Sequence, residues 1–378
     1  MKNPNAIVSS ILRFEPKLDK SPAEMLQAKD GLFVELEGGR RVRLDPKDPR
    51  SVAFTQILDG LHKQRLPVYL EIDPATEAVT RLLIPHLSRV AGVHHLEEGA
   101  LDIELELSAG RHVLRTENPD FADLEKVVDA AVKNRAPVIV VEDDEHNIID
   151  IQGYKPGPDV QRPPFLVEVP PLEKWPPDLH LGLWERIWRW RWWPWWWFKC
   201  ISVTKAQQVF DAMKATSCDP LTVPPPCIPF LYPDDGCWAR AHEMCRLMFN
   251  MWLTPKKVWI RASAGHFLHV DTKNNPQCYV NWGWHVAPTL CVRTWCCFFT
   301  QRMVIDPSLF NTPVSMSTWK SVQGDPNATL TETNASQYWP SGGTDPAYTD
   351  TNIRLAYYRL QLQNRSMLYG PPPYASCP

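Results

Sequence analysis

The sequence predicts an α+β protein built from a duplicated small domain followed by a larger domain of different composition. Three observations lead to this fold class: a segment that occurs twice in the first 156 residues, a proline-rich stretch at 156–177, and ten cysteines that all lie between Cys200 and Cys377. The chain has 378 residues, 44% of them hydrophobic and 22% charged, so it can bury more than one core. We expect domains at 1–156 and 200–378, joined by a linker at 157–199.

The duplicated segment runs from Gly39 to Pro85 and again from Gly110 to Pro156. Each copy reads as a strand, a helix with apolar residues at i, i+3, i+4 and i+7, and two further strands. We interpret 1–156 as a pseudo-symmetric α+β domain whose helices cover one face of a sheet. No catalytic motif is found in it, so we expect a role in targeting, in docking or as a pro-like segment.

The linker has two parts, a proline-rich stretch that is expected to be extended and a stretch rich in tryptophan. Proline, which fixes φ and removes a backbone donor, dominates 156–177. The segment Trp184–Phe198, WERIWRWRWWPWWWF, then mixes arginine with tryptophan. This composition suits contact with a membrane surface, and it equally suits a strip that packs the linker onto a neighbouring domain. Arg189, Arg191 and Pro194 interrupt it, so a membrane span is not expected.

Charge and cysteine usage bear on partners and location. The formal net charge is −3 and no long basic run occurs, which argues against a nucleic-acid partner. The N-terminus lacks the apolar core of a Sec signal peptide, whereas the cysteine-rich half suggests an oxidising compartment. Export by a non-Sec route or injection into another cell reconciles the two observations, and a cytoplasmic location is the alternative.

The second domain contains a cysteine, a histidine and an aspartate in an order that suits nucleophilic catalysis. In DDGCWARAHEM, Asp234 or Asp235 is expected to cap a helix that holds Cys237 in its first turn. There the helix dipole and free amides lower the pKa of a thiol and supply donors for an oxyanion. His285 and Asp306 follow on two strand-like runs. This order is that of papain-like and transglutaminase-like cores, so the three residues can converge.

Three motifs in this domain, DGCWARAHEM, WGWHVA and IDPSLF followed by PV and tryptophan, resemble those of bacterial protein-glutaminases across residues 205–319. The resemblance implies that Cys237 is the nucleophile, His285 the base and Asp306 its orienting partner. The implied reaction is hydrolysis of glutamine side chains in proteins or peptides to glutamate and ammonia through a cysteine thioester. No metal or organic cofactor is implied. The resemblance also favours a disulfide between Cys218 and Cys227.

Residues beside these motifs are candidates for substrate binding or for the oxyanion donors. They are Gly236, Trp238, Trp282, Gly283, Trp284 and Ser308. The protein-glutaminases have a small hydroxyl residue and a tyrosine just before the histidine, where this chain has Gly283 and Trp284, so its rate or substrate preference is expected to differ.

No metal site is expected from the spacing of ligand-type residues. The pair His94–His95 is interpreted as a solvated loop. His266 and His269, with Asp271, are interpreted as part of a surface hairpin. Adjacent Cys296 and Cys297 lack CxxC spacing. Cys245 is interpreted as a small buried residue.

Other classes of function remain open. A transglutaminase or a cysteine protease would use the same three residues, and a non-enzymatic membrane-active protein would depend on Trp184–Phe198 instead. For the deamidase, the expected partner is a protein or peptide with an accessible glutamine. Inhibition by the N-terminal domain and a role as an exported bacterial effector are further expectations.

Overall fold

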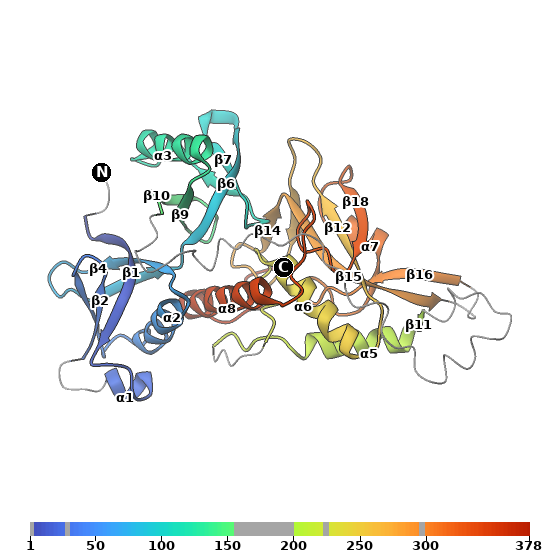
Figure 1. Ribbon diagram of the computed structural model, residues 1–378, viewed down its shortest axis with the longest axis horizontal. Coiled ribbons are helices and arrows are strands. Elements are labelled where there is room, and N and C mark those ends of the chain that lie inside the picture. The colour runs from blue at the N-terminus through green and yellow to red at the C-terminus, as the bar shows by residue number, and fades with distance from the viewer. Residues whose placement is uncertain (1–3, 27–30, 155–199, 222–226, 295–298) are drawn as a thin grey trace. The chain divides into compact units, whose positions relative to one another are not determined.

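The computed structural model describes residues 4–26, 31–154, 200–221, 227–294 and 299–378 (Figure 1). They form a mixed α+β protein with several sheets, as expected, and divide into two compact units. The first unit holds residues 4–154 together with the later segments 220–221 and Leu360–Pro371. Both later segments were expected in the second domain. The linker 157–199, with Trp184–Phe198, lies outside the described residues. No described helix is long and apolar enough to cross a membrane.

The first sheet of the first unit has the strand order β3-β2-β1-β4-β5. Helix α2 packs on β1 and β4 because Phe54, Ile57, Leu58 and Leu61 recur on one face and are all buried. The helix ends at Arg65, which takes a left-handed conformation. The elements are β1 (Ala6–Glu15), α1 (Pro22–Leu26), β2 (Leu32–Leu36), β3 (Arg41–Leu44), α2 (Ser51–Gln64), β4 (Pro67–Ile72) and β5 (Val79–Leu83).

The second sheet has the order β10-β9-β6-β7-β8, which repeats the connectivity of the first. Each sheet has five strands, two more than each copy of the sequence repeat contained, because β1 and β2 precede the first copy and β6 and β7 lie between the copies. Tyr69, Leu83 and Val141 pack together between the two sheets. The elements are β6 (His86–His95), η1 (Glu97–Gly99), β7 (Leu101–Leu105), β8 (His112–Leu114), α3 (Phe121–Asn134), β9 (Pro137–Glu142) and β10 (Ile148–Gly153).

The second unit is built on a largely antiparallel sheet of order β17-β16-β15-β12-β18, with β11 added in parallel beside β15. Helix α6 packs against the central strand β15 (Figure 1). Helix α5 begins directly after Ser202, whose hydroxyl caps it by accepting a hydrogen bond from the Lys205 N–H. The elements are β11 (Ile201–Ser202), α5 (Val203–Lys214), α6 (Cys237–Asn250), β12 (Lys256–Arg261), β13 (Leu268–Asp271), β14 (Tyr279–Trp282), β15 (Trp284–Thr294), β16 (Phe299–Val304), β17 (Val314–Ser315), α7 (Met316–Ser321), β18 (Thr329–Asn334) and α8 (Thr349–Tyr369).

Three disulfides crosslink the second unit, and two of them join residues that are far apart in the sequence. The bond between Cys218 and Cys227 confirms the pairing expected from the resemblance, and the others join Cys200 to Cys291 and Cys278 to Cys377. Cys296 and Cys297 lie outside the described residues.

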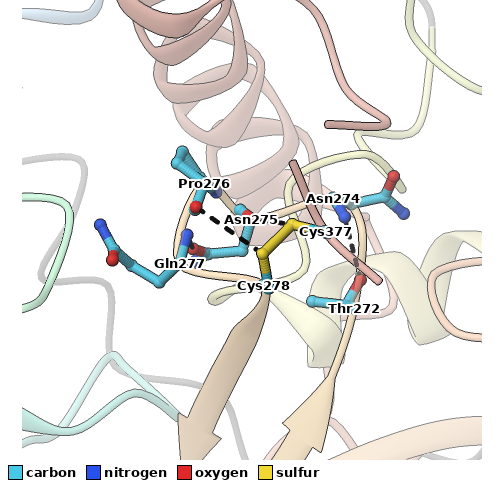
Figure 2. Close-up of a disulfide and its surroundings, with 7 residues drawn as sticks. All are labelled: Thr272, Asn274, Asn275, Pro276, Gln277, Cys278 and Cys377. Carbon is cyan, nitrogen blue, oxygen red and sulfur yellow. Dashed lines mark hydrogen bonds between the residues drawn. A yellow bond between two sulfur atoms is a disulfide. The ribbon is translucent and has the colours of Figure 1, made fainter. Parts of the chain in front are cut away.

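The bond between Cys278 and Cys377 ties the C-terminal tail to the β13–β14 hairpin, which confirms the hairpin expected there. Figure 2 shows the loop that leads into Cys278, in which the Asn275 carbonyl accepts a hydrogen bond from the Cys278 N–H at 2.9 Å. The side chain of Asn275 in turn donates to the carboxylate of Asp234, three residues before Cys237. The crosslink therefore braces a loop that supports the start of α6.

Replacing Cys278 and Cys377 together by serine is expected to lower the free energy of unfolding by about 4–5 kcal/mol, because the crosslink closes a loop of 99 residues. The matched control replaces Cys218 and Cys227, whose loop spans 9 residues, and is expected to lose roughly 2 kcal/mol less. Denaturant unfolding measures both losses. An equal or larger loss for the short loop would contradict this account.

Candidate active site

Cys237 is the first residue of α6, which confirms the predicted helix start. The predicted cap is wrong: the N-cap residue is Gly236, and no side chain caps the helix. The two aspartates are engaged elsewhere. Asp235 accepts hydrogen bonds from the Gly236 N–H at 2.8 Å and the Tyr358 hydroxyl at 2.7 Å, and the Asp234 carboxylate accepts one from Asn275. These contacts fix the turn that delivers Cys237.

Gly236 is required by this turn for two reasons. Its φ is +77°, and an added Cβ would lie 2.3 Å from Cδ2 of Tyr358. Substitution Gly236→Ala is therefore expected to lower the free energy of unfolding by about 2–4 kcal/mol. Gly283→Ala is the control, because no atom lies within 4 Å of an added Cβ there, and its loss is expected to stay below about 1 kcal/mol. Thermal unfolding compares the two, and similar losses would show that the turn is not the constraint.

His285 and Asp306 form a buried hydrogen-bonded pair. His285 is the second residue of β15, Asp306 follows β16, and the ring Nε2 donates to Oδ2 of Asp306 at 2.9 Å. The two residues are only 1% and 2% exposed. This bond places the ring proton on Nε2 and leaves the basic lone pair on Nδ1. Among the described residues, Nδ1 of His285 has no hydrogen-bond partner.

Two tryptophans hold the imidazole ring in this orientation. Trp282 stacks on it with centroids 4.3 Å apart, and Trp319 stacks at 5.4 Å. The indole N–H of Trp282 donates to the Asp234 carbonyl at 2.7 Å, so the stacking partner is itself fixed to the turn before Cys237. Rotation of the His285 ring would disrupt both stacks.

Asp306 is ionised by its partners despite its burial. Burial raises the pKa of this carboxyl, but the charge of His285 and hydrogen bonds from His285 and Trp319 outweigh it and hold the pKa below its ordinary value. Trp319 Nε1 donates to Oδ2 at 2.9 Å, and the Ser308 amide donates to Oδ1 at 3.2 Å. The Ser308 N–H is thus engaged with Asp306, which suits a positioning role. Trp319 is the tryptophan of the third motif, and no role for it was predicted from the sequence.

The environment of the Cys237 thiol differs from the expectation. The helix start was expected to lower its pKa, but burial raises it, and the thiol is 2% exposed. The Arg240 charge and a hydrogen bond from the Val286 amide oppose this rise, whereas the charges of Asp235 and Asp306 add to it. Because Val286 follows His285 on β15, the sulfur lies beside the strand that holds the ring. Ionisation of this thiol therefore requires a proton acceptor within the site.

The remaining candidates form an aromatic wall beside Cys237. Trp238 is fully buried and contacts Trp339 and Trp284, with centroids 4.8 and 5.7 Å away. Trp284 also contacts Trp259 at 5.7 Å. In the part of the chain that the structure describes, the indole N–H of Trp238 has no hydrogen-bond partner. An added Cβ at Gly283 would have no atom within 4 Å, so a side chain could be accommodated at that position.

A second buried polar group lies further along α6. Burial lowers the pKa of His242 to about 2, and the neutral ring accepts a hydrogen bond from Nζ of Lys257 at 3.0 Å. Lys257 also donates to the Gln337 carbonyl at 2.6 Å, and burial lowers its pKa to about 8. Cys245 is buried on the same helix, as expected, and burial raises its pKa to about 12. The local sequence KKVWIR, which forms β12, does not indicate that Lys257 is buried.

Comparisons with known proteins agree with the motifs. Residues 206–323 match the protein-family model described as Glutaminase, so the resemblance to the protein-glutaminases is confirmed over this segment. A crystal structure of a pro-protein-glutaminase has a similar fold, with a TM-score of 0.50 and 22% identity, over 78% of this chain and 99% of that one. An NMR structure of protein-glutaminase from Chryseobacterium proteolyticum is 29% identical over 39% of this chain and 80% of its own, with a TM-score of 0.34. No curated protein matches the chain.

Proposed function

We propose that the domain matched by the glutaminase family hydrolyses the side-chain amide of glutamine in proteins or peptides, releasing ammonia and leaving glutamate. The observation that carries this proposal is the buried His285–Asp306 pair, which lies within the matched residues and leaves Nδ1 of the ring available. Cys237 opens α6, the helix that packs on the same strand β15. A thiol, a base and an orienting carboxylate are the groups that acyl transfer from an amide requires.

Each of the three residues has one role in the proposed reaction. Nδ1 of His285 takes the proton of the Cys237 thiol, and the thiolate attacks the carboxamide carbon to form a C–S bond. The imidazolium then gives its proton to the departing ammonia as the C–N bond breaks, which leaves a thioester. Water, deprotonated by the same ring, cleaves the thioester to glutamate and restores the thiol. Asp306 keeps the imidazole in one tautomer and stabilises its charged form.

Proton transfer from the Cys237 thiol to the His285 ring offsets the energetic cost of a buried thiolate. An isolated anion would be disfavoured at this position, as the raised pKa of Cys237 indicates. Proton transfer to His285 instead creates an ion pair, whose two charges stabilise each other at low local dielectric. The Val286 amide and the Arg240 guanidinium add further stabilisation of the sulfur anion.

We further propose that the protein works after export and that its first unit restrains the enzyme. Three disulfides suit an oxidising compartment, and the solved structure with the similar fold is described as a pro-form. The test is limited proteolysis within residues 157–199, followed by assay of ammonia release from a glutamine-containing protein. Higher activity after cleavage is expected, and unchanged activity would refute inhibition by the first unit.

The reaction itself is tested by incubating the purified chain with a glutamine-rich protein and locating amide-to-acid changes by mass spectrometry. Conversion of glutamine to glutamate with matching ammonia release is expected. An amine joined to the substrate would indicate a transglutaminase, and new peptide termini would indicate a protease. Either product without glutamate would overturn the proposed deamidation.

A membrane-active role for Trp184–Phe198 is a separate hypothesis with its own test. It predicts that binding to anionic liposomes persists in Cys237→Ala and is lost when the tryptophans of this segment are replaced. Deamidation of a soluble substrate by that second variant would show that the two activities are independent.

A further inference from the structure

Four side chains of the second sheet meet around one buried carboxylate far from the motifs of the second unit in sequence. His86 begins β6, His112 begins β8, Glu142 ends β9, and His146 lies in the turn between β9 and β10. Glu142 Oε1 is 2.9 Å from Nε2 of His86 and 2.8 Å from Nδ1 of His146, and Oε2 is 2.6 Å from Nδ1 of His112. We call these four residues the His–Glu cluster.

The cluster has the ligand set of a transition-metal site. One ligating atom each from His86, His112 and Glu142 lie within 4.8 Å of one another. Two imidazoles and a carboxylate are donors that Zn²⁺ and its neighbours in the first row prefer, and Zn²⁺ commonly takes three such protein ligands with water as the fourth. The side chain of Glu142 is only 8% exposed, and a divalent cation would offset the unfavourable burial of its charge.

Outer contacts orient two members of the cluster. Nε2 of His112 lies 2.8 Å from the Ser108 hydroxyl, which also accepts the Gly110 amide at 3.0 Å. With the ring proton on Nε2, the Nδ1 lone pair of His112 is directed at the cluster. Such a partner on the far nitrogen is usual for a histidine that ligates a metal. His146 is not one of the three ligands. It contacts the Glu142 carboxylate and so positions it.

The first sheet shows that the fold does not need these polar residues. His86 pairs with Val140 in β9 as Ile7 pairs with Leu70 in β4. His112 pairs with Ile103 as Val42 pairs with Val34. Glu142 and Ile72 are the last residues of β9 and β4.

Three aliphatic residues of the first sheet, Ile7, Val42 and Ile72, therefore hold the positions that His86, His112 and Glu142 hold in the second. Val42 and Ile72 are 0% and 3% exposed, so they serve as core residues there. A packing requirement alone would be met by the same residue types in both sheets. The replacement of all three by metal-ligating side chains points to a ligand.

We propose that the His–Glu cluster binds one zinc ion through His86, His112 and Glu142 and so joins strands β6, β8 and β9 of the first unit. This site is independent of the deamidation proposed for the second unit. No metal was expected from the sequence, because the ligands lie on three strands with no short spacing between any two of them.

The test uses the full chain, stripped with a chelator and then titrated with Zn²⁺. Bound zinc is measured by elemental analysis, thermal unfolding is followed in parallel, and Co²⁺ is substituted for its visible spectrum. One zinc per chain, a higher unfolding temperature with metal, and a Co²⁺ spectrum of nitrogen and oxygen ligands without a thiolate band are expected.

The matched variant copies the first sheet, with His86→Ile, His112→Val and Glu142→Ile combined. It is expected to fold and to lose zinc binding, whereas His94→Ala, an exposed histidine on the same strand, is expected to retain it. Should the triple variant fail to fold, His112→Asn serves instead, with zinc affinity reduced at least about a hundredfold. His146→Ala is expected to weaken affinity roughly ten- to a hundredfold. No zinc bound by the wild-type chain, or equal binding by the triple variant or by His112→Asn, would overturn the proposal.

Discussion

Replacing Cys237 by alanine is expected to reduce ammonia release by on the order of 10⁴- to 10⁶-fold, as removal of a catalytic nucleophile does elsewhere. The physical reason is that no other described thiol can take its place. Cys245 lies two turns further along α6 and is itself buried, and the six remaining described cysteines are in disulfides. The assay is continuous measurement of ammonia from a glutamine-containing protein.

The matched control for this substitution is Cys245→Ala, which removes a buried thiol from the same helix. It is expected to cost about 1–2 kcal/mol of stability from lost packing while leaving turnover within a few-fold of wild type. Unfolding of both variants is followed by circular dichroism. Wild-type turnover in a folded Cys237→Ala protein would remove Cys237 from the reaction.

Asp306→Asn is expected to reduce turnover by on the order of 10²- to 10⁴-fold while preserving the volume of the side chain. The neutral amide cannot stabilise the imidazolium that forms when Cys237 gives up its proton, and it permits the wrong ring tautomer. The measurement is kcat for the variant and for wild type, with substrate affinity determined separately. A change in KM alone would show that Asp306 binds substrate rather than orienting His285.

A graded companion, Trp319→Phe, keeps a ring beside His285 but removes the N–H bond to Asp306. Turnover is expected to fall about tenfold, the worth of one charged hydrogen bond. The bond lowers the pKa of Asp306, so its loss raises that pKa. When the solution is acidified, the variant should therefore lose activity at a higher pH than the wild type does, because Asp306 becomes protonated sooner. If the acid side of the curve of turnover against pH is the same in the variant and in wild type, this role for Trp319 is contradicted.

Features of this chain that depend on nearby residues were predictable from sequence. The helix start at Cys237 and the β13–β14 hairpin both follow from apolar spacing and turn residues within a short window. The Cys218–Cys227 bond was predicted from the resemblance, and it closes a loop of 9 residues. These signals are local, and tertiary packing did not override them.

Features that depend on partners distant in sequence were not predictable. Asp234 or Asp235 was expected to cap α6, but Asp235 accepts a hydrogen bond from the Tyr358 hydroxyl, 123 positions away. The thiol of Cys237 was expected to ionise readily, but the depth of its burial is set by the whole unit. Lys257 and the His–Glu cluster likewise become visible only once strands from different parts of the chain lie together. The sequence carries these residues without a spacing that marks them.

The most direct test of the proposed mechanism is detection of the covalent intermediate. The chain is mixed with a glutamine-containing peptide, quenched with acid after brief reaction, and digested for mass spectrometry. The account predicts a peptide acyl group on Cys237, joined through sulfur and released by hydroxylamine, and none in Asp306→Asn at the same time point. Glutamate formed at full rate with no acyl group on Cys237, or with the acyl group on another residue, would contradict it.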